Sequence, residues 1–431
     1  MAPCLGSLKG KLITVWNYVL TEAKKLASSS RAVRVIMALM LIMYASWGGF
    51  VVMANKLIDF YLYYLAAEAL KRGLDLYQIS DPAWAELGRV LAVPHYAPPY
   101  RYPPLTALLV MPLLALKPRL AAFVWAFISA LALVGSAWLL AEATRSEFEG
   151  KNILPFVILG FFVPALTTLY AGQVNALILL TVAWAFFAFR RRRETLSGIA
   201  LAIGTMLKVI PIALTAYLFW RQRFRLVVAF IAGLLLIVLL TMPLVGVEIY
   251  KSYLTNGIAL GVRNEIMLYP PNQSLLGFLA RLLVHPATGR VEDQQILAQT
   301  LARSLSVLVV AATVLICWPK GSIEAFFDLE LSLVLIAVHL IAPVTWYHHL
   351  LLLAIPFTVL AQRGWQGTLS NPILGLALLA YGLIDIQGLF WHQLEPYPWL
   401  TSLATYGMLI LWGLLGWLIL KQKFPRAWKR G

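Results

Sequence analysis

Cysteine is nearly absent from this chain, and its scarcity excludes several classes of protein at the outset. The 431 residues contain only two cysteines, Cys4 and Cys317, which stand far apart in the sequence. A disulfide framework or a cysteine zinc site needs more cysteines at closer spacing. The Walker lysine loop, GxGxxG and HExxH motifs are missing as well. We therefore expect no disulfide, no bound metal and no cofactor.

Charged residues are also scarce. Only 13% of the residues are Asp, Glu, Lys or Arg, and 61% are hydrophobic. Soluble domains are about 25% charged and roughly 45–50% apolar. So much apolar surface cannot be hidden in a water-soluble core, and the composition predicts an all-α, polytopic integral membrane protein. We expect residues 1–431 to form a single transmembrane domain.

Acidic residues are the scarcer of the two signs of charge. There are 19 Asp and Glu against 35 Lys and Arg, a net charge of +16. In a soluble protein this excess would suggest nucleic acid, but in a membrane protein basic residues collect in cytoplasmic loops. We expect no nucleic-acid partner. Residues 8–30 mix apolar and basic positions, which is typical of an interfacial amphipathic helix.

The apolar segments predict a helical bundle of about ten full spans, with short re-entrant or half-length segments and external loop helices. Segment 104–116 is shorter than the ~17–25 residues of a full span. Segment 198–220 is expected to break between Lys208 and Pro211, because proline removes a helix hydrogen bond. The basic runs 190–193, 221–225 and 421–430 then predict that both termini are cytoplasmic. The polar loops 56–103 and 247–295 are predicted to face the extracytoplasmic side of the cell (plasma) membrane.

Asp59 follows the first apolar segment and opens the loop 56–103, which is predicted to carry the catalytic carboxylate. A carboxylate at this boundary is either a solvated helix end or a general base, which needs a partly dehydrated carboxylate near the acceptor hydroxyl. Further along the same loop, Arg101 and Tyr102 lie in a proline-rich segment. The Arg101 guanidinium matches phosphate oxygens, whereas the tyrosines also suit an interfacial aromatic belt.

Polar residues also interrupt the apolar segments at two later points. Gln173 and Asn175 follow Gly172 in a tight turn, where they can bind sugar hydroxyls or satisfy freed backbone groups. Lys208 lies midway in an apolar run, where a buried amine needs an anionic partner. That partner is either a lipid phosphate or a carboxylate of the protein.

Two further clusters lie in predicted external segments. Asn272 and Gln273 open a helical pattern, so they are either ligand-binding groups at a helix start or ordinary helix caps. His348 and His349 follow Trp346 and Tyr347 between two spans. A histidine there can hold a phosphate or move a proton, or it can simply sit at the interface. Because an external site lacks cytoplasmic nucleotide sugars, these groups favour a donor carried on a lipid.

Taken in order, these segments resemble the GT-C superfamily of membrane glycosyltransferases, and more closely glycosyltransferase family 87. That family contains bacterial α-mannosyltransferases that use polyprenyl-phosphate mannose. The elements that carry the resemblance are Asp59-Phe60-x-x-Tyr63-Tyr64-x-Ala66-Ala67, Leu76-Tyr77, Tyr100-x-Tyr102-Pro103-Pro104, Gly172-Gln173-x-Asn175, Lys208-x-x-Pro211, Asn272-Gln273-Ser274 and Pro343-x-x-Trp346-x-His348-His349.

The resemblance implies an inverting transfer from a polyprenyl-phosphate sugar, most simply mannose, to an acceptor hydroxyl outside the cytoplasm. Asp59 would be the base. Lys208 and either His348 or His349 would hold the lipid phosphate, assisted by Arg101. The residues expected to line the sugar or the acceptor are Tyr63, Tyr102, Gln173, Asn175, Asn272 and Gln273.

The expected acceptor is a lipid-linked, glycan or glycolipid hydroxyl in the same membrane. The family often has Pro-Tyr-Asp where this chain has Asp75-Leu76-Tyr77-Gln78, so Asp75 and Gln78 inherit no role. No metal is implied, since Asp59 lacks a second acidic neighbour. Two alternatives stay open at this stage: a GT-C enzyme that uses arabinose or glucose, and a lipid or sugar transporter or flippase.

Overall fold

A computed structural model describes residues 30–94, 96, 98–144, 152–258, 271–284, 291–394 and 397–425. The predicted interfacial helix 8–30 lies outside these residues except for its last position. The helices of the first half are α2 (Ser30–Met53), α3 (Ile58–Lys71), α4 (Asp81–Val90), α5 (Pro104–Val110), η1 (Met111–Ala115), α6 (Pro118–Ala143), α7 (Leu154–Phe161), α8 (Val163–Ala171), α9 (Asn175–Arg190) and α10 (Glu194–Leu207).

The second half of the chain continues the same all-helical pattern. Its helices are α11 (Ile212–Trp220), α12 (Phe224–Val245), α13 (Val247–Ser252), η2 (Tyr253–Gly257), α15 (Leu275–Leu283), α16 (Val291–Ile316), α17 (Ile323–Ile341), η5 (Tyr347–Leu353), α18 (Ala354–Trp365), α19 (Asn371–Leu389), α20 (Trp391–Leu394), η6 (Leu400–Ser402) and α21 (Leu403–Lys423). The all-α membrane architecture predicted from the sequence is confirmed.

Within the described residues, six helices are long and apolar enough to cross a membrane, and the bent pair α7–α8 makes a seventh. Three shorter apolar stretches accompany them: Pro104–Ala115, Asn175–Arg190 and Glu194–Leu207. The total of about ten spans stays a prediction. The short segment near 104–116 is confirmed as α5 and η1.

The predicted break inside segment 198–220 is confirmed. Helix α10 ends at Leu207, Lys208 has an extended backbone, and α11 starts at Ile212 directly after Pro211. Helices α10 and α12 approach closely because Gly198 lies against the Leu226 carbonyl group. Small residues at such contacts let membrane helices pack backbone to backbone.

Helices α7 and α8 meet at a bend of 57°. Pro164, at the start of α8, has no N–H to continue the helix, and the backbone groups that the bend frees find side-chain partners. The Tyr44 hydroxyl donates to the Leu159 carbonyl (2.6 Å), and the Tyr381 hydroxyl donates to the Ile158 carbonyl (3.0 Å). The Val163 N–H donates to Asp385 Oδ1 (3.0 Å). Asp385 thus caps α8 from α19.

A buried ion cluster ties α11, α17 and α21 together. Glu330 is fully buried, and its two carboxylate oxygens lie 3.3 Å from Arg221 Nε and 2.6 Å from Lys423 Nζ. The Tyr217 hydroxyl donates to the same carboxylate (2.8 Å). Buried charges persist only when paired and hydrogen-bonded in this way.

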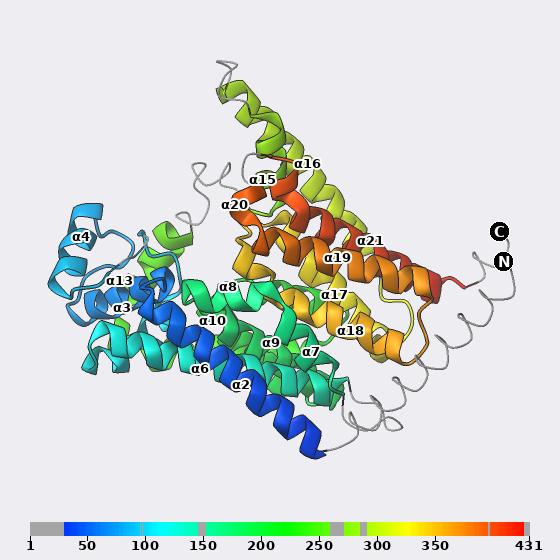
Figure 1. Ribbon diagram of the computed structural model, residues 1–431, viewed down its shortest axis with the longest axis horizontal. Coiled ribbons are helices and arrows are strands. Elements are labelled where there is room, and N and C mark those ends of the chain that lie inside the picture. The colour runs from blue at the N-terminus through cyan, green and yellow to red at the C-terminus, as the bar shows by residue number, and fades with distance from the viewer. Residues whose placement is uncertain are drawn as a thin grey trace, which may run out of the picture.

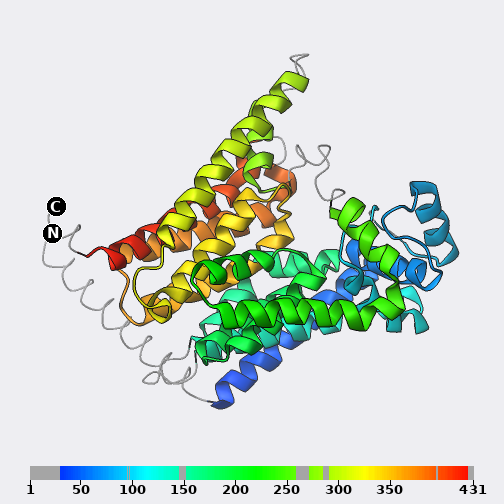
Figure 2. The same ribbon diagram turned by 180° about the vertical axis from the view of Figure 1, so that it is seen from behind.

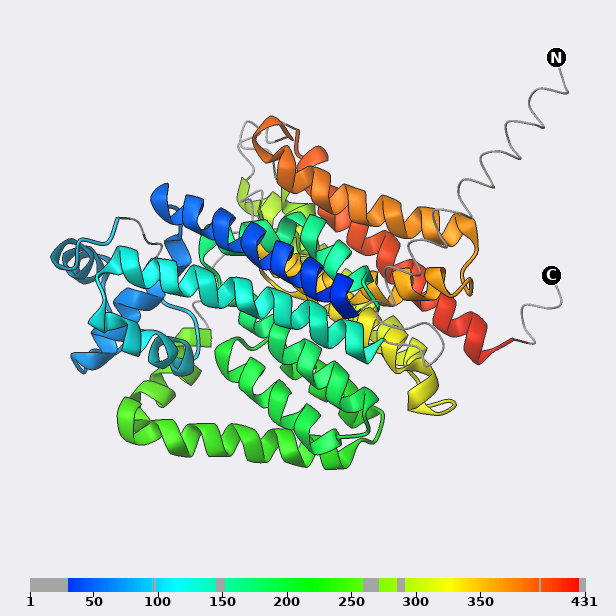
Figure 3. The same ribbon diagram turned by 60° about the horizontal axis from the view of Figure 1, so that its bottom comes forward.

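The short helices that follow α2 and α12 gather at one end of the bundle. Figure 1 shows α3, α4 and α13 together at one end, far from the beginning of α2. Figure 2 shows α16 on the outside of the bundle, projecting past its neighbours. Figure 3 shows α12 along another edge, beside α10. Only 17% of the apolar stretch of α12 and 11% of that of α16 are buried, as expected for helices that face lipid.

Candidate active site

Asp59 is the second residue of α3. This helix contains no glycine or proline, ends just before Gly73, and is buried over most of its length. Asp59 itself is partly exposed at the edge of this buried helix. Burial raises the pKa of its carboxyl from the ordinary value to about 6, while a hydrogen bond from Gln173 and the charge of Arg101 lower it. The carboxylate is therefore ionised at neutral pH and still basic enough to accept a proton.

Gly172 brings Gln173 against the start of α3. Its φ of 69° is in the left-handed region, which ends α8 and which glycine adopts without strain. A Cβ at this position would lie 2.7 Å from Phe60 Cβ, so no larger residue fits. The Trp125 indole N–H donates to the Gly172 carbonyl (2.8 Å) and holds the turn.

Two tyrosines orient the Gln173 amide. The Tyr63 hydroxyl donates to Gln173 Oε1 (3.1 Å), and Gln173 Nε2 donates to the Tyr102 hydroxyl (3.0 Å). The two tyrosine rings pack edge to face with centroids 4.8 Å apart. Tyr63 and Gln173 are buried, whereas Tyr102 is partly exposed. In this arrangement Tyr63 orients Gln173, which hydrogen-bonds to Asp59, and Tyr102 is partly exposed beside them.

Lys208 lies at the break between α10 and α11, on the other side of Tyr102. Its Nζ is 2.9 Å from Asn175 Oδ1 and 2.7 Å from His349 Nε2. The same Nζ is 5.6 Å from the centroid of the Tyr102 ring. The candidate residues Lys208, Asn175 and His349 are thus brought together from the break after α10, from α9 and from η5.

The two histidines have different surroundings. His349 is buried, and its Nδ1 accepts from the Trp346 N–H (3.3 Å). His348 is partly exposed, and its carbonyl accepts from Asn175 Nδ2 (3.0 Å) and the Thr168 hydroxyl (3.2 Å). His349 is therefore the histidine joined to Lys208, while the Nε2 atom of His348 is buried without a hydrogen-bond partner among the described residues and can serve a ligand that enters the site.

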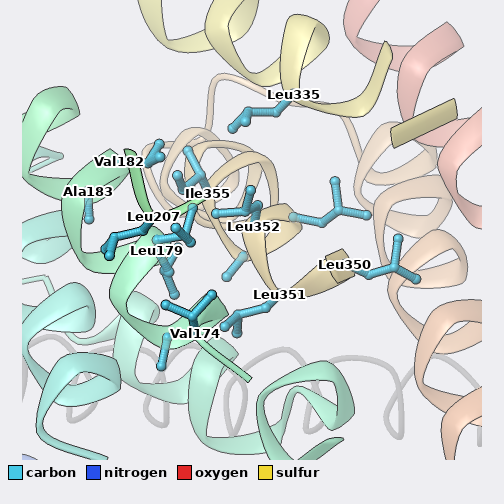
Figure 4. Packing of buried hydrophobic residues seen from close by; sticks show 14 of the residues in the cluster. Val174, Leu179, Val182, Ala183, Leu207, Leu335, Leu350, Leu351, Leu352 and Ile355 are labelled. Atoms are coloured by element: carbon cyan, nitrogen blue, oxygen red, sulfur yellow. The ribbon is translucent and has the colours of Figure 1, made fainter. Parts of the chain in front are cut away.

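The apolar core lies directly beneath this site. Figure 4 shows Leu351 and Leu352, which follow the histidines, among Val174, Leu179 and Leu207. All five side chains are buried. Because this core continues from the turn after Gly172 to the end of α10, it links the positions of Gln173, Asn175 and Lys208.

Asn272 and Gln273 occupy a different place from the one expected for sugar ligands. Both are fully buried. Asn272 Oδ1 accepts from the Thr345 N–H (3.0 Å), and the Gln273 N–H donates to the Thr345 carbonyl (2.6 Å). Gln273 Nε2 donates to the Thr401 carbonyl (2.9 Å). Since these amides bind backbone, the geometry favours a positioning role: they hold the segment that leads into His348.

Sequence reasoning missed several residues that support the site. Thr168 supports the His348 carbonyl, and the ring of His339 contacts the His349 carbonyl (3.0 Å). Arg281 is buried, and its guanidinium donates to the Asn272 carbonyl (2.6 Å). Arg281 gave the one signal in the sequence, because it stands in an apolar helical segment, where a buried arginine would need a partner. The contact of Thr168 depends on distant segments and leaves no local pattern.

The arrangement combines one carboxylate with an amine and two imidazoles. The carboxylate can take a proton, and the Lys208–His349 pair can hold an anion a short distance away. Within the part of the chain that the structure describes, no three His, Cys, Asp or Glu side chains group closely enough to hold a metal ion.

Three mycobacterial mannosyltransferases are similar to this chain over most of its length. The polyprenol-phosphate-mannose-dependent alpha-(1-2)-phosphatidylinositol mannoside mannosyltransferase of Mycobacterium tuberculosis is 24% identical over 370 residues, which cover 79% of this chain and 82% of that protein. The polyprenol-phosphate-mannose-dependent alpha-(1-2)-phosphatidylinositol pentamannoside mannosyltransferase of Mycolicibacterium smegmatis is 24% identical over 363 residues, 83% of this chain and 80% of that protein. The counterpart of the latter in M. tuberculosis is 23% identical over 343 residues, 77% of this chain and 76% of that protein.

A family model covers more than half of the chain. It matches residues 100–343 and therefore includes Tyr102, Gln173, Asn175 and Lys208. Asp59 lies well before the first matched residue, and the two histidines lie just after the last one. On this match, together with the relatives above, the chain belongs to glycosyltransferase family 87.

Proposed function

We propose that this glycosyltransferase moves a mannosyl residue from a polyprenyl-phosphate donor to a hydroxyl of a glycolipid acceptor. The names of the relatives support this donor and an acceptor of the phosphatidylinositol mannoside class. The observation that carries the proposal is the joining of Lys208 to His349 beside the Asp59 carboxylate. A base and an anion-binding pair are the two groups that transfer from a sugar phosphate requires.

The proposed chemistry is a single displacement that inverts the sugar. Asp59 takes the proton of the acceptor hydroxyl, whose oxygen bonds to the anomeric carbon as the bond from that carbon to the phosphate oxygen breaks. The electron pair leaves on the polyprenyl phosphate, which gains a negative charge. Lys208, His349 and the side chain of His348 stabilise this charge, because donors aimed at a developing charge lower the barrier.

Helix α9 supports an extracytoplasmic location for the site. Asn175 lies at its first residue and Arg190 at its last, and a 16-residue helix is ~24 Å long at about 1.5 Å per residue. Basic residues 190–193 therefore lie a membrane-scale distance from the site. Because such clusters gather on the cytoplasmic side, we propose that the site faces outward and that the termini are cytoplasmic.

The test is a transfer assay with the purified protein in lipid bilayers, using polyprenyl-phosphate mannose labelled in the sugar and phosphatidylinositol mannosides as acceptors. Asp59→Asn should reduce the rate by ~10²–10⁴-fold, the usual contribution of a positioned base. Glu68→Gln, on the same helix but paired with Arg72, is the matched control and should retain the rate. If the wild type transfers sugar from an arabinose or glucose donor instead, the proposed mannose donor is wrong. If labelled donor lipid accumulates without any transfer product, the result favours a transporter or flippase.

A further inference from the structure

The contacts of the Lys208 amine define which atoms can carry protons. Asn175 is oriented by His348, since Asn175 Nδ2 donates to the His348 carbonyl (3.0 Å). Its Oδ1 therefore faces Lys208 and accepts a hydrogen bond from Nζ (2.9 Å). This leaves the contact between Nζ and the His349 ring to be explained.

The His349 ring is oriented by the backbone of Trp346. The Trp346 N–H points at Nδ1 (3.3 Å), so Nδ1 presents a lone pair. A neutral imidazole carries one proton, which must then be on Nε2. The Nε2–H in turn points at Lys208 Nζ, 2.7 Å away.

An ammonium group cannot complete this set of contacts. It has three donors and no acceptor, so it would direct an N–H against the Nε2–H of His349. A neutral amine donates to Asn175 and accepts from His349 through its lone pair, and every contact is then a hydrogen bond. The other histidine tautomer would let an ammonium donate to Nε2, but it would set the Trp346 N–H against an Nδ1–H.

The charges around Lys208 do not impose an ammonium form. Among the described residues, Asp59 is the one acidic group whose charge acts on Lys208, and its carboxylate is also acted on by Arg101. No carboxylate in the described part of the chain lies within the 4.0 Å of an ion pair with Lys208. The remaining titratable neighbours are Tyr102, His348, His349 and His339, none of which is an anion at neutral pH. Lys208 is only partly exposed, and an ammonium without an ion-pair partner is costly in such surroundings.

The geometry points to a neutral Lys208 amine in the empty site, which takes one proton from water when the phosphate of the donor binds. This inference rests on the proposed donor class. The proton bonds to the Nζ lone pair, which can then no longer accept from His349. The freed Nε2–H of His349 and the new ammonium both donate to phosphate oxygens, so one protonation supplies the charge and one further donor.

The protonation state of the empty site is tested without any substrate. In the detergent-purified protein carrying carbon-13 at lysine Cε, the resonance lost in Lys208→Arg should have the shift of a neutral amine at neutral pH. Lys71→Arg, which replaces an exposed lysine of α3, identifies the shift of an ordinary ammonium. If the Lys208 resonance has that ammonium shift, the inference is overturned whatever the enzyme transfers.

The coupling to binding is tested by calorimetry with farnesyl phosphoryl mannose, a phosphodiester that does not titrate near neutral pH. Titrations in buffers of different ionisation enthalpy should give uptake of about one proton per bound ligand in the wild type and in Lys71→Arg, and almost none in Lys208→Arg. Above the pKa of the empty-site amine, wild-type affinity should fall about tenfold per pH unit, whereas Lys208→Arg stays flat.

The two proposals fail differently in these experiments. Binding without proton uptake in the wild type overturns the coupling and leaves the donor class supported. A neutral Lys208 resonance with no binding of the probe supports the neutral amine and counts against the proposed donor.

Discussion

Replacing Gln173 by leucine should move the acid limb of the activity profile to higher pH. Asp59 must be deprotonated to act as a base, so kcat/KM is lost as pH falls through its pKa, about 6 in the wild type. Gln173 is one of the groups that lower this pKa, by hydrogen bonding to the carboxylate. A hydrogen bond to a charged group contributes about 1.5–3 kcal/mol, which corresponds to ~1–2 pH units.

The assay is kcat/KM for mannosyl transfer measured across the pH range, with the donor well below saturation so that the free enzyme is titrated. The midpoint of the acid limb should rise by ~1–2 units in Gln173→Leu. Tyr64→Phe is the matched control, because it removes another hydrogen bond of α3, from the Tyr64 hydroxyl to the Leu116 carbonyl (2.8 Å), away from Asp59. An unchanged or lower midpoint in Gln173→Leu would refute the reasoning that this amide stabilises the ionised base.

Three further predictions concern the framework of the site. Glu330→Ala should destabilise the protein by ~3–5 kcal/mol, because it leaves two buried cations uncompensated, whereas Glu324→Ala at the surface should cost less than ~1 kcal/mol; thermal melting in detergent checks both. Gly172→Ala should lower both the melting temperature and the transfer rate, since its φ of 69° strains alanine and a Cβ overlaps α3, while Gly160→Ala, with nothing within 4 Å, should do neither. Asn272→Ala should reduce the transfer rate and donor affinity more than Asn272→Asp, which keeps the oxygen that accepts from the Thr345 N–H; equal losses would argue against a positioning role.

The helical membrane architecture and the break between α10 and α11 could be predicted from local sequence patterns. Composition alone indicated a helical membrane protein, and a proline after a mid-segment lysine located the break between α10 and α11. The expectation that Lys208 acts together with one of the two histidines came from the family resemblance, and the structure brings Lys208 to His349. The contact of Lys208 with Asn175, which was expected to line the sugar, was not predicted.

The sequence could not distinguish polar residues that face a ligand from polar residues that bind backbone. Asn272 and Gln273 have the side chains of sugar-binding residues, but their burial depends on contacts with residues 343–345 and 401, far away in the chain. Glu330 escaped notice for the same reason, since its cations come from the ends of α11 and α21.

The segments that build the site enter the membrane at very different times during synthesis. Asp59 lies in α3, shortly after the first long helix, whereas His349 is added nearly three hundred residues later. The ring of Tyr347 is held through its hydroxyl by the Ile384 carbonyl of α19 (2.6 Å). A ribosome that stalls anywhere before α19 is inserted therefore leaves a fragment that contains Asp59 but no firmly held histidines. Under the function proposed above, we expect such a fragment to transfer no sugar, so that activity begins only when the chain is essentially complete.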